Sequence, residues 1–222
     1  MRSIYQKILA NKKKHKALLA VLVDPDKFNE DLIVLANSCN VFCFFVGGSK
    51  LHKGSIDFVV KRIKKMSKLP VVIFPGDFDQ MHKSADAGLI PVLVSGRNPD
   101  YLIGKHVVWA KKIQSLNIET IPTAYILING KKTSTTQVVT NTSPLTSKQE
   151  IINTAIASEL MGLKLLYLEA GSGASKQVNS KIIAEVKNKV NIPLVVGGGI
   201  NSVSKATEII KSGADVIVIG NA

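Results

Sequence analysis

The stretch LVVGGGINSVSKATEIIKSGADVIVIGN, residues 194–221, holds two short apolar runs, each followed by a glycine-bearing turn, with an amphipathic segment between them. The runs Leu194–Val196 and Val216–Ile219 have the length and the β-branched side chains of buried strands, and Ser202–Ser212 has the periodicity of a helix. A strand–helix–strand order is typical of parallel sheets, because parallel neighbours need a long crossover connection. The stretch therefore predicts an α/β protein.

The same alternation extends over the rest of the chain. Six further apolar runs predict strands at Ala17–Val23, Val41–Val46, Val71–Phe74, Ile90–Val94, Thr120–Ile128 and Leu165–Glu169. Helices are expected near Glu30–Ser38, Ser55–Lys68, Gly104–Leu116, Ser147–Met161 and Asn179–Val190. Eight strands in strict alternation favour a (β/α)8 TIM barrel, formed as a single domain by residues 1–222. A doubly wound open sheet is the alternative, since alternation alone does not distinguish the two folds.

Three segments depart from a regular barrel. Pro75–Gly88 leaves little room for a third helix, and the chain stops at Ala222, immediately after the eighth strand. We therefore expect a barrel that is modified around the third helix and lacks a visible final helix. The third segment, Asn129–Pro144, is rich in Thr and Ser, and a loop of this length in a compact domain is usually functional or mobile.

Charge and composition narrow the class of partner. Lys and Arg total 29 against 16 Asp and Glu, a net charge of +13 that favours nucleic acid, an anionic membrane surface or phosphorylated substrates. Aromatic residues are only 5% and are not interleaved with the basic ones, which argues against nucleic acid. Cys39 and Cys43 fit core thiols of a reducing compartment, and no signal peptide or membrane span is found. We expect a cytoplasmic protein, and peripheral membrane contact stays open.

The glycine turns after the last two predicted strands indicate a phosphate site. Gly197–Ile200 and Gly220-Asn221 can present backbone N–H donors without an obstructing Cβ, and barrels commonly bind phosphate at the loops after strands seven and eight. The alternative is that these glycines only make tight turns. Their occurrence on both strands favours the phosphate interpretation.

Carboxylates follow two other strands at the same end of the predicted barrel. Glu169 closes an apolar strand, and Tyr167 has the same side-chain parity, so both should point into the barrel mouth. Asp24 and Asp26 follow the first strand, where a carboxylate beside a phosphate site suggests Mg²⁺, and Ser49 after the second strand could add a hydroxyl ligand. Asp24 and Asp26 could equally begin a helical turn, where the helix dipole favours Asp.

Eight short motifs, taken in order, resemble the geranylgeranylglyceryl phosphate synthase family, in particular its second, larger-oligomer branch. They are DPDK (24–27), VGGS (46–49), FPG (74–76), SGRNP (95–99) with LIGKH (102–106), YLEAGSG (167–173), GGGI (197–200) and GNA (220–222). YLEAGSG and SGRNP are more specific than the glycine turns. One branch of the family carries a Lys where this chain has Leu22, so the glycerol phosphate would find its cation elsewhere, with Lys27 as one candidate.

The resemblance implies a prenyltransferase. It would transfer a polyprenyl group, most simply geranylgeranyl, from its diphosphate to the C3 hydroxyl of sn-glycerol 1-phosphate, and it would act as a homo-oligomer. Mg²⁺ on the diphosphate would be held by Asp24 and Ser49, and Glu169, with Tyr167, would orient or deprotonate the hydroxyl. The residues expected to bind glycerol phosphate are Tyr167, Leu168, Glu169, Ala170, Gly171, Ser172, Gly173, Gly198, Gly199, Gly220 and Asn221. Pro75–Gly88 would form one wall of the prenyl groove, and Arg97 and Lys105 could face phosphate.

Two other functions remain open at this point. A sugar-phosphate isomerase or epimerase would share the phosphate site but would need acid and base groups on opposing strands. A non-enzymatic barrel that binds anions would need no catalytic carboxylate, and its affinity would fall steeply with salt.

Overall fold

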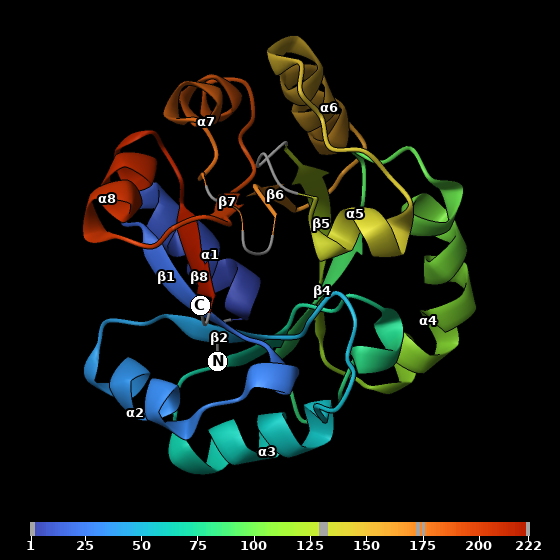
Figure 1. Ribbon diagram of the computed structural model, residues 1–222, viewed down its shortest axis with the longest axis vertical. Coiled ribbons are helices and arrows are strands. Elements are labelled where there is room, and N and C mark those ends of the chain that lie inside the picture. The colour runs from blue at the N-terminus through green and yellow to red at the C-terminus, as the bar shows by residue number, and fades with distance from the viewer. Residues whose placement is uncertain (1–2, 129–132, 172–173, 175, 221–222) are drawn as a thin grey trace.

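The computed structural model describes residues 3–128, 133–171, 174 and 176–220, and in it eight parallel strands close into a barrel in sequence order, β1 to β8 (Figure 1). β1 pairs with β8, with Leu22 beside Gly220, so the sheet has no free edge and the open-sheet alternative does not apply. The strands are β1 Leu18–Val23, β2 Cys43–Val46, β3 Val71–Ile73, β4 Ala87–Val92, β5 Glu119–Leu127, β6 Leu165–Glu169, β7 Leu194–Gly197 and β8 Val216–Gly220.

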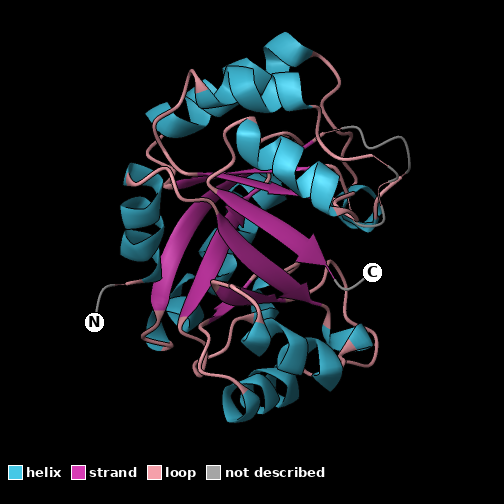
Figure 2. Cartoon of the chain, turned by 90° about the vertical axis from the view of Figure 1, so that its left-hand side faces the viewer, coloured by secondary structure: helices cyan, strands magenta, loops and turns pink. Residues whose placement is uncertain are grey.

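Helices cover the barrel, and all except α1 and α5 lie where the alternation predicts them (Figures 1 and 2). They are α1 Ile4–Lys13, α2 Glu30–Ser38, α3 Ile56–Met66, α4 Lys105–Ser115, α5 Thr135–Thr140, α6 Lys148–Leu160, α7 Ser180–Lys187 and α8 Val203–Lys211. Most begin at a Ser or Asn whose side chain accepts a backbone N–H of the first turn, as Ser55, Ser147 and Ser202 do. None of the helices among the described residues is long and apolar enough to cross a membrane.

Side chains of each strand alternate between two apolar layers. On β6, Leu165 and Tyr167 point into the barrel, whereas Leu166 and Leu168 pack under the outer helices. The predicted parity of Tyr167 and Glu169 is therefore confirmed, because both lie on the inward side. The carboxyl ends of the strands form one mouth, toward which the arrowheads point in Figure 2.

The first helix, which the apolar pattern did not predict, closes the opposite end of the barrel. A capping box at Ser3 begins α1, and the Glu119 carboxylate at the start of β5 accepts the backbone N–H groups of Ile4 and Tyr5 at 2.6 and 2.9 Å. Ile4 and Ile8 are buried against the inner layer. In Figure 2 the helix that follows N lies at the end where the strands begin.

The predicted irregularity after β3 is confirmed, since a single 3₁₀ turn at Phe78–Gln80 stands where a regular barrel has a helix. The predicted β4 was misplaced: the strand covers Ala87–Val92 instead of Ile90–Val94. Ala87 and Gly88 pair with β3, while Leu93 N–H turns away to the carbonyl of Tyr101. The residues after β8, Asn221 and Ala222, lie outside the described residues, so the expectation of a missing final helix has no structural account.

Candidate active site

A cavity of about 740 Å³ occupies the mouth of the barrel, above the inner apolar layer. It collects most of the predicted site residues, although they come from five different strands: Asp24, Ser49, Tyr167, Glu169, Gly171, Gly198, Gly199 and Gly220. The barrel topology brings them together because parallel strands present all their carboxyl ends at one face.

Glu169 lies at the inner edge of this cavity, and only 7% of it is exposed. Burial raises the pKa of its carboxyl to about 7, although the backbone N–H of Gly171, which donates to Oε1 at 2.7 Å, and the nearby Tyr167 hydroxyl act in the opposite direction. A carboxyl group with such a pKa exchanges protons readily near neutral pH. Its position and pKa suit a general base.

Two glycines of the β7 turn fit against Glu169 and Tyr167 because they lack side chains. A Cβ on Gly197 would lie 2.3 Å from the Tyr167 hydroxyl oxygen and 2.9 Å from Glu169 Oε2. A Cβ on Gly198, which has a φ of +83°, would lie 2.3 Å from Glu169 Oε1. The predicted phosphate turn is thus also the wall that holds the carboxylate in place, so glycine is required here for packing as well as for its N–H groups.

Aromatic rings form the floor of the cavity beside the carboxylate. Tyr167 stacks on Phe74 with 5.0 Å between ring centroids and lies 5.4 Å from the ring of Tyr125. Burial, followed by the charge of Glu169, raises the pKa of both tyrosines, so both hydroxyls stay protonated. The buried Tyr167 oxygen makes no hydrogen bond of good geometry with any described residue. A buried hydroxyl without a partner is costly, and a polar ligand atom in the cavity could satisfy it.

The two predicted metal ligands lie on adjacent loops. Asp24 is the first residue after β1 and accepts the N–H of Asp26 at 3.0 Å. A Cβ on Gly48, next to Ser49, would lie 3.3 Å from Asp24 Oδ1. Among the described residues no group of three or more His, Cys, Asp or Glu side chains could hold a metal ion unaided. One carboxylate and one hydroxyl instead fit Mg²⁺ shared with a substrate phosphate, because Mg²⁺ keeps waters and takes few protein ligands.

Asp26 has a structural task in the same region. Its carboxylate accepts backbone N–H groups from His52 at 2.9 Å, Lys53 at 2.8 Å and Gly54 at 2.6 Å. These bonds lower the pKa of Asp26 and join the β1 loop, which carries Asp24, to the β2 loop, which carries Ser49. Asp26 is therefore a positioning residue for the two candidate metal ligands, because its oxygens are already committed to the backbone.

For the substrates that the resemblance implies, replacing Asp26 by alanine is expected to raise KM for the Mg²⁺–prenyl diphosphate pair about tenfold, roughly the effect of 1.4 kcal/mol. Asp26→Asn keeps one acceptor oxygen and should raise it less. Steady-state kinetics with each substrate varied would measure both changes. KM for glycerol phosphate serves as the internal control and should change less than about twofold, because its predicted cup lies on β6 to β8. Equal increases for both substrates would contradict this role.

Several cations face the mouth, but not all that were predicted. Lys27, Lys50, Lys53 and Lys105 line the cavity, and Lys105 also forms an ion pair with Asp77. The predicted phosphate residue Arg97 does not line it, since its guanidinium donates to Val94 and Thr154. Leu22 lies in the cavity wall beside Gly220, so the cation that one branch of the family has there must come from another strand.

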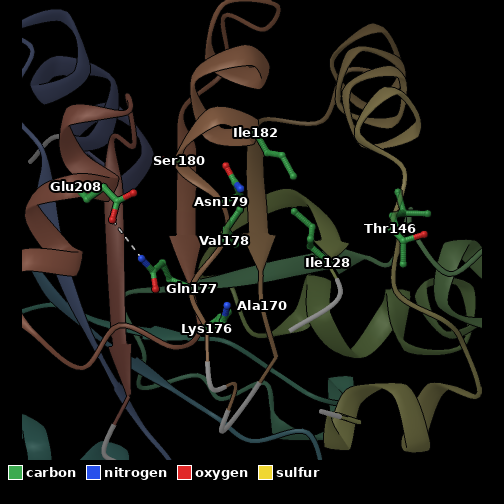
Figure 3. A pocket seen from close by; sticks show the side chains of 11 residues that line it. Ile128, Thr146, Ala170, Lys176, Gln177, Val178, Asn179, Ser180, Ile182 and Glu208 are labelled. Atoms are coloured by element: carbon green, nitrogen blue, oxygen red, sulfur yellow. Dashed lines mark hydrogen bonds between the residues drawn. The ribbon is translucent and has the colours of Figure 1, made fainter. Parts of the chain in front are cut away.

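Two predicted substrate-binding residues lie outside the mouth. The Leu168 side chain packs in the outer layer, and Ala170 lines a second cavity of about 430 Å³ between α6 and α7 (Figure 3). That cavity is bordered by Asn179 at the start of α7 and by Gln177, whose amide donates to Glu208 at 3.2 Å. Leu168 and Ala170 could therefore contact a substrate in the mouth only through their backbone atoms. Ser172, Gly173 and Asn221 lie outside the described residues.

The sequence did not point to two further residues: Gln80, which contacts loops of the mouth, and Thr136, which lines it. Gln80 is buried; its amide donates to the Gly48 carbonyl at 2.8 Å, and its Oε1 accepts from Gly48 and Gly76 at 3.3 Å each. Thr136 on α5 hydrogen-bonds Ser49 at 3.2 Å. No local pattern marks either residue, because their partners on the β2 loop, Gly48 and Ser49, are 32 and 87 positions away.

A closed (β/α)8 barrel with glycine turns and a buried carboxylate at its mouth has the arrangement of the phosphate-binding barrel enzymes. A family model described as the PcrB family matches residues 10–222. The chain therefore belongs to the PcrB family.

Relatives and a solved structure agree with that placement. The geranylgeranylglyceryl phosphate synthase of Zunongwangia profunda is 43% identical over 100% of this chain and 97% of that protein. The synthase of the same name from Pyrococcus furiosus is 36% identical over 98% of this chain and 88% of that protein. The Thermoplasma acidophilum (S)-3-O-geranylgeranylglyceryl phosphate synthase, solved with its substrate sn-glycerol-1-phosphate, matches with a TM-score of 0.93 and 27% identity, covering 100% of this chain and 91% of that one.

Proposed function

We propose that this chain is a prenyltransferase that joins a polyprenyl group, most simply geranylgeranyl, to the C3 hydroxyl of sn-glycerol 1-phosphate through an ether bond, with Mg²⁺ as cofactor. The observation that carries the proposal is Glu169, a buried carboxyl with a pKa of about 7 packed directly against the glycine turn of β7. Relatives that match nearly the whole of this chain carry the name geranylgeranylglyceryl phosphate synthase, which supports the same activity.

The described residues suggest how the reaction would proceed. Backbone N–H groups of the Gly198, Gly199 and Gly220 turns would hold the glycerol phosphate, which places its free hydroxyl toward Glu169. As the hydroxyl oxygen bonds to C1 of the prenyl chain, the C1–O bond to the diphosphate breaks, the diphosphate leaves with the bonding electrons, and Glu169 takes the hydroxyl proton. Mg²⁺ held by Asp24 and Ser49 would neutralise the charge that develops on the diphosphate.

The carboxylates of the mouth argue against an isomerase or epimerase. Among the described residues that line the cavity, the carboxylates are Asp24, Asp26, Asp77 and Glu169. Asp26 is bound to three backbone N–H groups and Asp77 is paired with Lys105. Proton transfer at two faces of a sugar phosphate needs two acid–base groups. The remaining partner for Glu169 would be Asp24, which we assign to Mg²⁺, so the second acid–base group of an isomerase or epimerase would be missing.

A product assay tests the proposal directly. Purified protein, Mg²⁺, geranylgeranyl diphosphate and labelled sn-glycerol 1-phosphate should move label into the organic phase. Samples with sn-glycerol 3-phosphate, or with EDTA in place of Mg²⁺, should not. Absence of transfer from folded protein with this donor and with longer prenyl diphosphates would refute the proposal, and sugar phosphates would then be screened.

The pH dependence of the reaction should report Glu169. Because the base must be ionised and its pKa is about 7, kcat/KM for glycerol phosphate should rise about tenfold between pH 6 and pH 8 and level off above that. Initial rates in buffers of constant ionic strength and saturating Mg²⁺ would give the profile. A flat profile between pH 5.5 and 8.5, with chemistry rate-limiting, would show that Glu169 is not the base.

We also propose that the protein forms a homo-oligomer through α4. No residue of this helix is fully buried within the chain; Val107 and Val108 are 69% and 77% exposed, and Ile103, just before the helix, is 60% exposed. An exposed apolar face of this kind usually marks an interaction surface. A second copy of the chain is the simplest occupant, because identical apolar patches complement each other across a two-fold axis.

Introducing charge on that face should separate the subunits. Val107→Glu is expected to shift the molar mass, measured by size-exclusion chromatography with light scattering, to that of a smaller assembly. Val34→Glu on α2 is the matched control: Val34 is 60% exposed, but α2 already buries Ile33 and Ala36. A wild-type monomer, or an unchanged mass for Val107→Glu, would contradict the α4 interface.

We further propose that the protein is cytoplasmic and binds the surface of an anionic membrane, since the prenyl donor is amphiphilic and the chain carries a net charge of +13. Sedimentation with vesicles that contain anionic lipid, at low and high salt, tests it. Binding that is absent at low salt would remove this part without affecting the prenyltransferase assignment.

A further inference from the structure

The helix α5 contacts loops from both halves of the mouth. It lies between β5 and α6 in the chain, and Figure 1 shows it beside the end of β5. A capping box at Ser134 begins it, and Asn141 in the left-handed conformation ends it. Thr135, Thr136, Val139 and Thr140 line the cavity. The sequence predicted only a functional or mobile loop at this place.

On the metal side of the mouth, α5 contacts a candidate ligand of Mg²⁺. The Oγ1 atom of Thr136 lies 3.2 Å from Oγ of Ser49, within hydrogen-bond distance. A hydroxyl oxygen that coordinates a cation still has its proton to donate, and the cation makes that proton a stronger donor. Binding of metal by Ser49 would therefore strengthen a Ser49-to-Thr136 hydrogen bond.

On the glycerol phosphate side, the first residue of the same segment packs against the turn that holds Glu169. Ser134 is buried, and a Cβ on Gly171 would lie 3.0 Å from Ser134 Cβ. The N–H of Gly171 is the group that donates to the Glu169 carboxylate at 2.7 Å. A small displacement of Ser134 would therefore reach the catalytic carboxylate through a single turn.

The C-terminal half of α5 is held from a third loop. The Tyr101 hydroxyl donates to the Val139 carbonyl at 3.1 Å, and the Asn98 amide donates to the Thr140 carbonyl at 2.9 Å. The Thr140 hydroxyl in turn donates to the Thr136 carbonyl at 2.7 Å. Because the C-terminal half of α5 is held in this way, a force on Thr136 would move Ser134 at the start of the helix and not the C-terminal half.

We propose that α5 couples the two substrate sites and that Thr136 is the positioning residue through which it does so. This inference rests on the proposed prenyltransferase function. Ser49, when it holds the metal of the diphosphate, would fix Thr136 through their hydrogen bond, and α5 would then hold Ser134 against the Gly171–Glu169 turn. Each substrate consequently binds more tightly when the other is present, and by thermodynamic necessity the factor is the same in both directions.

Isothermal titration calorimetry measures the coupling between the two substrate sites without turnover. The probes are sn-glycerol 1-phosphate and Mg²⁺ with geranylgeranyl thiodiphosphate, an analogue that resists transfer. In the wild type, the Kd of glycerol phosphate should fall at least about fivefold when Mg²⁺ and the analogue are present, a typical coupling. In Thr136→Val, the factor should fall to near one, while the Kd of sn-glycerol 1-phosphate alone changes less than about twofold.

Two matched variants separate the hydroxyl of Thr136 from helix stability. Thr136→Ser keeps a hydroxyl at this position and should retain the coupling, and Thr135→Val makes the same chemical change one residue earlier on an exposed side chain and should also retain it. Thermal unfolding checks that all variants fold. Wild-type coupling in folded Thr136→Val, or no coupling in the wild type, would overturn the inference. Absence of product from the wild type would instead refute the proposed function.

Discussion

Glu169→Gln is expected to lower kcat by a factor of about 10² to 10⁴, the usual contribution of a positioned general base. The amide is close in shape to the carboxylate and can still accept the Gly171 N–H at Oε1, so the turn should keep its form. It cannot take the proton of the attacking hydroxyl. Single-turnover rates with saturating substrates would measure the loss, and calorimetry should show glycerol phosphate binding within about threefold of the wild type.

The same variant should make the folded protein more stable at alkaline pH. The Glu169 carboxyl has a pKa of about 7 in the folded state against 4.5 ordinarily, so the unfolded chain loses its proton first as pH rises. Stability is thus lost between about pH 4.5 and 7, and the loss is complete above pH 7. Its size is on the order of 3 kcal/mol, which glutamine removes.

Melting temperatures of metal-free wild type and Glu169→Gln at pH 5 and pH 8 would test this expectation. The variant should gain several degrees over the wild type at pH 8 and little at pH 5, at roughly 2–4 °C per kcal/mol for a chain of this length. Equal differences at both pH values would show that the carboxyl group does not carry a raised pKa. The combination of lost activity and gained stability would mark Glu169 as a site where function opposes stability.

Gly197→Ala is expected to have the second largest effect, through geometry. The new methyl group would lie 2.3 Å from the Tyr167 hydroxyl oxygen and 2.9 Å from Glu169 Oε2, so one or both must move. Both side chains are buried, and overpacking of this kind costs roughly 1–3 kcal/mol of folding free energy. A displacement near 1 Å of a catalytic group can reduce the rate about 10²-fold. Denaturant unfolding and kcat would measure the two effects.

A double mutant separates crowding by Tyr167 from displacement of Glu169. Tyr167→Phe removes the hydroxyl, which makes no hydrogen bond of good geometry with a described residue, so this change alone should cost little stability. In the Tyr167→Phe background, Gly197→Ala should cost less stability than in the wild type, because its closest contact is gone. Strictly additive losses of stability in the double mutant would contradict the predicted crowding. If the double mutant recovers both activity and stability relative to Gly197→Ala, the loss of activity in Gly197→Ala comes from the contact with Tyr167.

Much of this protein can be predicted from local sequence. The apolar, β-branched runs and the helical periodicity between them predicted all eight strands, with β4 misplaced by three residues at its start, and the glycine turns expected after β7 and β8 line the barrel mouth. Glu169, at the end of an apolar strand, could be identified because strand parity alone directs it into the mouth. These features depend on residues within a few positions of each other, where backbone preferences act directly.

The tertiary structure decided which segments that are distant in the sequence contact each other. The segment 134–140 reads as a polar loop, and it becomes helix α5 where Thr136 meets Ser49, 87 positions away. Asp26 could be a metal ligand or a helix cap by sequence, and only the fold commits it to the backbone of residues 52–54. Likewise the sequence by itself determined that Glu169 faces the barrel mouth, whereas its pKa of about 7 arises from burial among residues of other strands. Desolvation is a property of the whole packed interior, and it exists only once the barrel has closed.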